Sequence, residues 1–396
     1  MSDENQRPAG YQRLKVLFLT PWYPIRNSPV SGVFIREHAK AVQLYDDVIV
    51  FHCQRQIDLH KLWQVVPELE GNSSARLPTY RVFYRQSKIP NFSFFLEFGS
   101  VLSGVWRLHK QGFRPDIIHA HTYTSGAIAV LLAKWLHVPA VVTEHSTEFP
   151  RKLVSGAGIW RARLAFSQAS FVLPVSMALQ RAIEAYGIRA KFRIVPNVVD
   201  TELFRPALSR SEAKLKRLLT VALLDLSHKK GIPDLLQALA RLQVKRTDWQ
   251  LDIVGDGPAQ VEYEQLVENL NLKDRVKFHG AKSKSEVAQF MQHAHLFVLP
   301  SRFETFSVVT AEALAVGLPV LVTQCGGPEE FITAEVGMTV PVENVSALQT
   351  ALNTMLETLD AYTPTHIAEY ATTRFSPQGV GAALHDIYLQ VSRRYD

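Results

Sequence analysis

Two glutamates, Glu304 and Glu312, stand on either side of a predicted helix start. The first lies in a polar loop, where its carboxylate could accept hydrogen bonds from sugar hydroxyls. The second lies about one turn inside the helix, where it could accept from both hydroxyls of a ribose. A pair of solvated glutamates would look the same in isolation, so the surrounding residues decide between the two interpretations.

The residues around this pair predict a strand, a loop, a helix and a second strand. Gly317 is placed to end the helix, and Pro319 prevents it from resuming. The first backbone N–H groups of the helix, at 306–309, and the positive end of its dipole would suit a diphosphate. We therefore expect a nucleotide-sugar site. The predicted elements are a strand at 296–299, a loop at 301–306, a helix at 307–316 and a strand at 318–322.

Two further positions fall where predicted strands end. Gly32 follows the first strand and has no side chain, so a phosphate or sugar could approach its backbone, although an ordinary turn glycine would look the same. A later strand ends in Ile-Ile-His-Ala-His, and we expect only one of its histidines, His121, to point toward a ligand. A metal site would need further ligands that the sequence does not reveal, so no metal is expected.

Strand-like apolar runs alternate with helix-length segments along the whole chain, which predicts an α/β fold with parallel sheets covered on both faces. The apolar rhythm breaks at 196–206, between two prolines, as in a linker between domains. We expect two Rossmann-like halves facing a common cleft. The remaining predicted strands are 15–20, 48–52, 117–120, 140–144, 171–175 and 193–195 before the linker, and 218–223, 250–254 and 276–278 after it.

Composition limits the class of protein. The 396 residues, 47% hydrophobic and 20% charged, suffice for two full cores, and no window approaches the ~20 apolar residues of a membrane span. Residues 1–12 are polar and lack the apolar core of a signal peptide, which predicts a cytoplasmic protein. The two cysteines, Cys53 and Cys325, suit a reducing compartment and have no metal-ligand spacing.

The net charge of +6 could reflect attraction to anionic lipid, to polyanionic polysaccharide or to nucleic acid, or nothing specific. Of these partners, we do not expect nucleic acid. One stretch could rest on a membrane surface as a peripheral contact. Its cations Arg76, Arg81, Arg85 and Lys88 alternate with aromatic residues and lead into the phenylalanine-rich segment 91–98. The favoured alternative is that these phenylalanines form the buried side of a helix.

The block around Glu304 resembles the signature of the retaining glycosyltransferases of family 4, in which two glutamates separated by seven residues precede a Gly-Gly turn. The segment SGVFIREHAKAV, 31–42, looks like that of bacterial capsule and exopolysaccharide enzymes. The matching positions in the block are Pro300, Ser301, Glu304, Phe306, Glu312, Ala313, Ala315, Gly317, Pro319, Val320, Gly326, Gly327 and Glu330.

The resemblance implies the GT-B fold, with an acceptor-side domain at 1–196 and a donor domain at 206–375. A C-terminal helix within 376–396 would cross back to the first domain. It implies catalytic roles for Lys230, Glu304 and His121, and an acceptor side with Glu144 and His145. The implied donor-binding residues are Gly32, Arg302, Thr305, Phe306, Ser307, Val308, Val309 and Glu312, and the implied nucleobase pocket is Gly255, Gly280 and Ala281.

One position departs from the family pattern. Leu223 stands where the family has an arginine that neutralises the leaving diphosphate. Arg302, Lys229 or His228 could take its place. If none does, the chain would be a non-catalytic sugar-nucleotide or polysaccharide-binding protein.

The function implied is retaining, metal-independent transfer of a sugar from a nucleoside diphosphate, with a UDP-linked hexose or N-acetylhexosamine favoured, to an acceptor hydroxyl. The acceptor could be a saccharide, a lipid-linked sugar or a small molecule, and surface-polysaccharide synthesis is the favoured setting. No cofactor beyond the nucleotide sugar is expected. The sequence has no D-x-D, G-x-S-x-G, Walker A or dinucleotide G-x-G-x-x-G pattern. A phosphorylase or a sugar-nucleotide epimerase remains an alternative.

Overall fold

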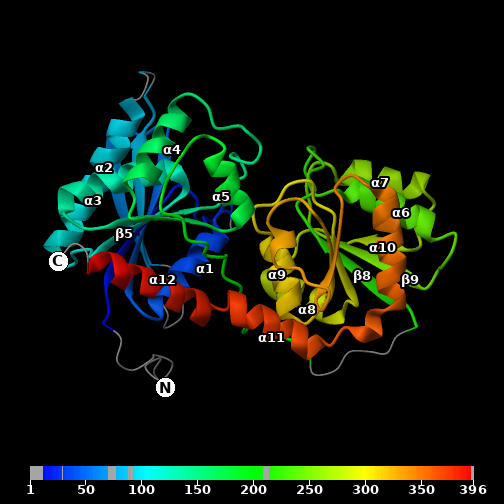
Figure 1. The fold of residues 1–396 in the computed structure, drawn as a ribbon. Coiled ribbons are helices and arrows are strands. Elements are labelled where there is room, and N and C mark those ends of the chain that lie inside the picture. Colours follow the sequence, from blue (N-terminus) through cyan, green and yellow to red (C-terminus); the bar gives the residue numbers. More distant parts are fainter. Residues whose placement is uncertain are drawn as a thin grey trace. The chain divides into compact units, whose positions relative to one another are not determined.

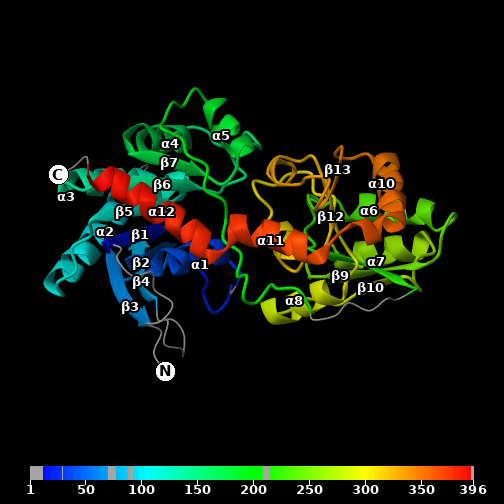
Figure 2. The same ribbon diagram turned by 60° about the horizontal axis from the view of Figure 1, so that its bottom comes forward.

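The computed structural model describes residues 12–28, 30–69, 77–87, 89, 92–207 and 214–393 (Figures 1 and 2). Arg76, Lys88 and Asn91 of the proposed membrane stretch lie outside these residues, as do residues 1–11. The chain divides into two compact units. One runs to Val198 and resumes at Pro377, and the other is Val199–Ser376.

The first unit contains a seven-stranded sheet in the order β3-β4-β2-β1-β5-β6-β7. Only β3 runs antiparallel to its neighbour, at the edge of the sheet. The inner strands are continuous apolar runs because helices cover both faces of a parallel sheet. The strands are β1 Lys15–Thr20, β2 Asp47–Gln56, β3 Trp63–Leu69, β4 Pro78–Arg85, β5 Ile117–His121, β6 Ala140–Glu144 and β7 Phe171–Pro174.

The last helix of the chain packs in the first unit, against the first helix. Gly381 lies against the backbone of Ala41, and Tyr45 donates a hydrogen bond to the Gln378 carbonyl at 3.0 Å. His385 contacts the buried Asp46, whose pKa burial raises. The helices of this unit are α1 Val33–Gln43, α2 Phe92–Lys110, α3 Thr122–Leu136, α4 Ala157–Gln168, α5 Met177–Glu184 and α12 Pro377–Ser392.

The second unit contains a six-stranded parallel sheet in the order β10-β9-β8-β11-β12-β13. Its strands are β8 Lys216–Val221, β9 Trp249–Val254, β10 Val276–Phe278, β11 Leu296–Leu299, β12 Val320–Thr323 and β13 Gly337–Val340. Its helices are α6 Ile232–Leu242, α7 Gln260–Asn269, α8 Lys284–His293, α9 Val308–Ala315, α10 Val345–Glu357 and α11 Pro364–Phe375, with short 3₁₀ turns at Pro328–Glu330 and Leu359–Ala361.

The prediction of two α/β units with mainly parallel sheets is confirmed, and several details are corrected. Residues 193–195 are not a strand, although the backbone N–H of Arg193 donates to the carbonyl of Val172 in β7. The sequence analysis missed β3, β4 and β13. Among the described residues, no helix is long and apolar enough to cross a membrane.

Gly381 tests the contact between α12 and α1. A Cβ at this position would lie 2.3 Å from the Ala41 carbonyl oxygen, a backbone atom that cannot move aside cheaply. We expect Gly381→Ala to lower the free energy of unfolding by about 1–3 kcal/mol, as overpacking does. Urea unfolding measures the change. Gly158→Ala in α4 is the matched control because its nearest neighbour would be 3.4 Å away. Equal midpoints for the two variants would contradict the close contact.

Candidate functional site

The loop between β11 and α9 holds Glu304 in a polar cluster. Lys230 donates to its Oε1 at 2.6 Å, and the Ser301 hydroxyl donates to the same oxygen at 2.9 Å. Both members of the ion pair are largely withdrawn from solvent, with 20% of the Lys230 side chain and 13% of the Glu304 side chain exposed. One ammonium proton is therefore committed to Glu304, while the other two remain available to a ligand.

Lys230 reaches Glu304 because two loops approach each other at backbone distance. Gly231 has φ of 66°, and a Cβ there would meet the Pro300 carbonyl oxygen at 1.9 Å. The Arg302 N–H also donates to the Lys229 carbonyl at 2.7 Å. Only glycine fits at this close approach, which explains why Gly231 follows Lys230.

Backbone groups and small polar side chains form the start of α9. Ser307 precedes the helix with φ of 69°, and its hydroxyl pairs with that of Thr310 at 2.8 Å. Thr305, Val308 and Val309 are half-buried. The ring of Phe306 is buried against Phe331 and Phe375, with centroids 5.1 and 5.4 Å away. Phe306 can therefore offer a ligand only its backbone.

Glu312 lies in α9 and is 7% exposed. Lys284, at the start of α8, places its ammonium 3.9 Å from the Glu312 carboxylate. The sequence analysis did not find Lys284, because the contact joins two helices that are distant in sequence. A carboxylate is a good acceptor for the two hydroxyls of a ribose.

Leu223, at the arginine position of the family, is 56% exposed. The three cations that could replace the arginine already have partners. Arg302 pairs with Asp234 at 3.4 Å and Glu343 at 3.3 Å, and Lys229 pairs with Asp225 at 3.4 Å. His228 contacts the Tyr263 hydroxyl at 2.9 Å and lies 3.6 Å from Glu262.

The predicted nucleobase residues meet at the ends of β9 and β10. Gly255 donates its N–H to the Gly280 carbonyl at 2.9 Å, and Ala281 is exposed beside them. Gly255 has φ of 130°, and a Cβ there would lie 1.9 Å from the Ala222 carbonyl oxygen. The glycine is therefore required by the fold itself.

In the first unit, the expectation that only one histidine of β5 points toward the ligand side was wrong. His119 and His121 are two residues apart, and such residues share a face of a strand. Their rings stack with centroids 4.5 Å apart. His119 is held by the Tyr388 hydroxyl at 2.6 Å and the Thr143 hydroxyl at 2.7 Å, whereas His121 contacts His145 Nε2 at 3.0 Å.

His38, from α1, completes a group with His121 and His145 that the sequence analysis missed. In the described part of the chain, it is the one group of three side chains spaced to hold a metal ion, with nitrogens within 4.8 Å of one another. His38 Nε2 lies 3.1 Å from the Pro196 carbonyl, while buried His38 Nδ1 and His121 Nε2 have no protein partner. Burial lowers the pKa of all three, to about 4 for His38, so their imidazoles are neutral at neutral pH.

Glu144 and Gly32 have structural explanations in this unit. The Glu144 carboxylate is fully buried and accepts from the backbone N–H groups of Tyr123, His145 and Ser146 at 2.7, 2.9 and 2.8 Å. Burial raises its pKa to about 7. Gly32 has φ of 66°, and a Cβ there would lie 2.4 Å from the Trp22 backbone.

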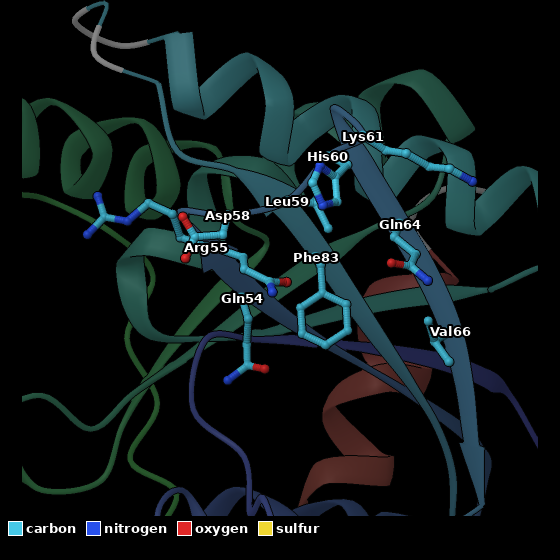
Figure 3. Close-up of a pocket in the computed structure, with 10 residues that line it drawn as sticks. Gln54, Arg55, Asp58, Leu59, His60, Lys61, Gln64, Val66 and Phe83 are labelled. Atoms are coloured by element: carbon cyan, nitrogen blue, oxygen red, sulfur yellow. The ribbon is translucent and has the colours of Figure 1, made fainter.

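A hollow of about 630 Å³ opens elsewhere in the first unit, at the ends of β2 and β4 (Figure 3). Phe83 lies near its centre, among amide and charged side chains. None of the predicted site residues lines it. Its lining is Gln54, Arg55, Gln56, Asp58, Leu59, His60, Lys61, Gln64, Val66 and Phe83.

The buried histidines predict a specific pH dependence of stability. In the unfolded chain His38 binds a proton below about pH 6.5, whereas in the folded protein its pKa is about 4. The folded protein therefore loses stability as pH falls below about 6.5. Between pH 7 and 5, we expect the free energy of unfolding of His38→Asn to fall by about 2 kcal/mol less than that of the wild type. Glu144 has the opposite pH dependence, but it is present in both proteins and cancels.

Urea unfolding at the two pH values measures this difference. His60→Asn, at an exposed position, is the control. A His38→Asn protein that parallels the wild type at both pH values would show that His38 takes up its proton in the folded state.

Two family descriptions match consecutive parts of the chain. Residues 41–203 match "Glycosyltransferase Family 4", and residues 205–374 match "Glycosyl transferases group 1". The uncharacterized glycosyltransferase YqgM of Bacillus subtilis (strain 168) is 28% identical over 55% of this chain, and the match spans 61% of that relative.

Other similarities extend over nearly the whole chain. The putative teichuronic acid biosynthesis glycosyltransferase TuaC of B. subtilis (strain 168) is 28% identical over 96% of this chain and 99% of that protein. The crystal structure of Anabaena Alr3699/HepE in complex with UDP has a TM-score of 0.74 at 22% identity, covering 95% of this chain and 100% of that one. The two α/β units are thus those of the GT-B fold. The chain belongs to the group 1 glycosyltransferases of family 4.

Proposed function

We propose that this protein transfers a sugar from a nucleoside diphosphate donor to an acceptor hydroxyl with retention of anomeric configuration. A UDP-linked hexose or N-acetylhexosamine is the proposed donor. The contact that carries the proposal is the ion pair of Lys230 with Glu304, next to the start of α9. The similarity to HepE, solved with UDP, and to TuaC, named for teichuronic acid biosynthesis, supports a UDP sugar and a role in surface polysaccharides.

The donor diphosphate would bind the backbone N–H groups around the start of α9, at Phe306, Ser307, Val308 and Val309. Lys230 would place its remaining ammonium protons on the leaving phosphate. Glu304 fixes the position of that ammonium, so little reorganisation is needed as negative charge develops. Glu312 would accept hydrogen bonds from the ribose hydroxyls.

The transfer step exchanges one bond for another on the same face of the sugar. The bond between the anomeric carbon and the diphosphate oxygen breaks, and the acceptor oxygen bonds to that carbon. The departing phosphate oxygen takes the acceptor's proton. No protein nucleophile and no metal ion enters this scheme.

Removal of either member of the ion pair tests this arrangement. We expect Lys230→Ala and Glu304→Gln each to reduce kcat by at least about tenfold, equivalent to ~1.4 kcal/mol. The loss in Lys230→Ala has two causes: the phosphate loses its cation, and Glu304 loses its partner. Turnover of a panel of UDP, GDP and ADP sugars with chelator present measures the effect, and NMR of the product gives its anomeric configuration.

Lys273→Ala, on an exposed ion pair of the same unit, is the control and should retain full activity. Normal turnover in both site variants would exclude the assigned site. Product with inverted configuration would exclude retention, and dependence on an added metal would exclude the metal-free scheme.

Leu223 supports a second candidate, a non-catalytic binding protein, because the nearby cations are already paired with carboxylates. If the protein is an enzyme with a weakened site, an added cation should help. We expect Leu223→Arg to raise kcat/KM for the nucleotide sugar by about tenfold. Leu223→Gln, which adds polarity without charge, should give no gain. Nucleotide-sugar binding without turnover in the wild type and in Leu223→Arg would favour the binding protein.

A further inference from the structure

The outward face of α2 carries large apolar side chains. Phe92, Phe95 and Trp106 recur at helical spacing on this face, and they are 42%, 64% and 60% exposed. The helix packs on the sheet through its other side, where Gly104 lies against the ring of Phe51. Solvent-facing helix positions are normally polar, so an aromatic outer face indicates an interaction surface.

A fourth aromatic side chain extends this face onto α4. Trp160 is 56% exposed, and its ring lies 5.8 Å from that of Phe94 in α2. The Phe94 ring in turn lies 6.0 Å from that of Phe95. The two helices therefore contribute to one surface, and Figure 1 shows both in the first unit.

Basic residues accompany the aromatic side chains, and the segments that carry these basic residues contain no acidic residue. Residues 98–114 contain Arg107, Lys110 and Arg114, and residues 149–168 contain four further cations, with no Asp or Glu in either segment. Lys110 places its ammonium 3.6 Å from the centre of the Trp106 ring. The one acid of α2, Glu97, is on the buried side. A protein partner of mixed charge would not require this exclusion of acids, whereas an anionic surface would.

We propose that this face, formed by Phe92, Phe95, Trp106 and Trp160 with the cations Arg107, Lys110, Arg161 and Arg163, docks on an anionic lipid bilayer. Trp and Phe rings enter the region between headgroups and acyl chains, while Lys and Arg contact lipid phosphates. The contact is peripheral. Lipid docking goes beyond sugar transfer and does not depend on it.

Vesicle flotation of the full chain tests the proposal. Vesicles of phosphatidylcholine alone are compared with vesicles that also contain phosphatidylglycerol, at low and high salt. We expect binding to the anionic vesicles that weakens with salt. Phe95→Ser with Trp106→Ser, and separately Lys110→Glu with Arg163→Glu, should each weaken binding by about tenfold or more.

Two controls match these changes outside the face. Val261→Ser removes a 64% exposed apolar side chain from α7, and Lys245→Glu reverses an exposed cation, both in the second unit. Neither should alter binding, and urea midpoints must show that all variants are folded. Absence of wild-type binding, equal binding to neutral vesicles, or equal losses in the controls would overturn the proposal. A dimer that Phe95→Ser with Trp106→Ser abolishes, without vesicle binding, would instead assign the face to a second copy of the chain.

Discussion

The second unit depends on a close approach of two backbones, at Gly231 and Pro300. This contact brings the loop after β8 against the loop after β11, and so places Lys230 on Glu304. A mostly buried ion pair offers little net stability, because desolvation of the charges offsets their attraction. In the proposed reaction, its value is positional: each charge holds the other at a point where a leaving phosphate would need a cation.

The first unit contains a group of buried, neutral imidazoles, whereas the site of the second unit contains the ion pair of Lys230 with Glu304. His38, His121 and His145 come from three different elements, and burial keeps them unprotonated. The other histidine of β5, His119, is fixed by Tyr388 from α12. The last helix therefore does more than pack on α1, since it orients a ring that stacks on His121.

The sequence predicted most strands but missed β3, β4 and β13, which lie at or next to the edge of a sheet. The inner strands β1, β6 and β11 have the predicted bounds, because strands buried on both faces are continuous apolar runs. The bounds of β10, an edge strand, were also predicted. β3, at the edge, and β4, next to it, mix polar and apolar residues and contain prolines, which hides them from a search for apolar runs. Site residues near a motif could be named from the sequence. Contacts such as Lys284 with Glu312 could not, because tertiary packing creates them.

The chain leaves the first unit at Val198 and returns to it at Pro377, so the second unit is in effect an insertion within the first. During synthesis the first sheet emerges before the second unit, whereas α12, which covers α1, emerges only after it. The first unit therefore cannot complete its core until the second unit has been made, whereas the second unit is a continuous segment that can fold as soon as it has emerged. A truncated product would expose the apolar face of α1 and be recognisable to the cell's quality control.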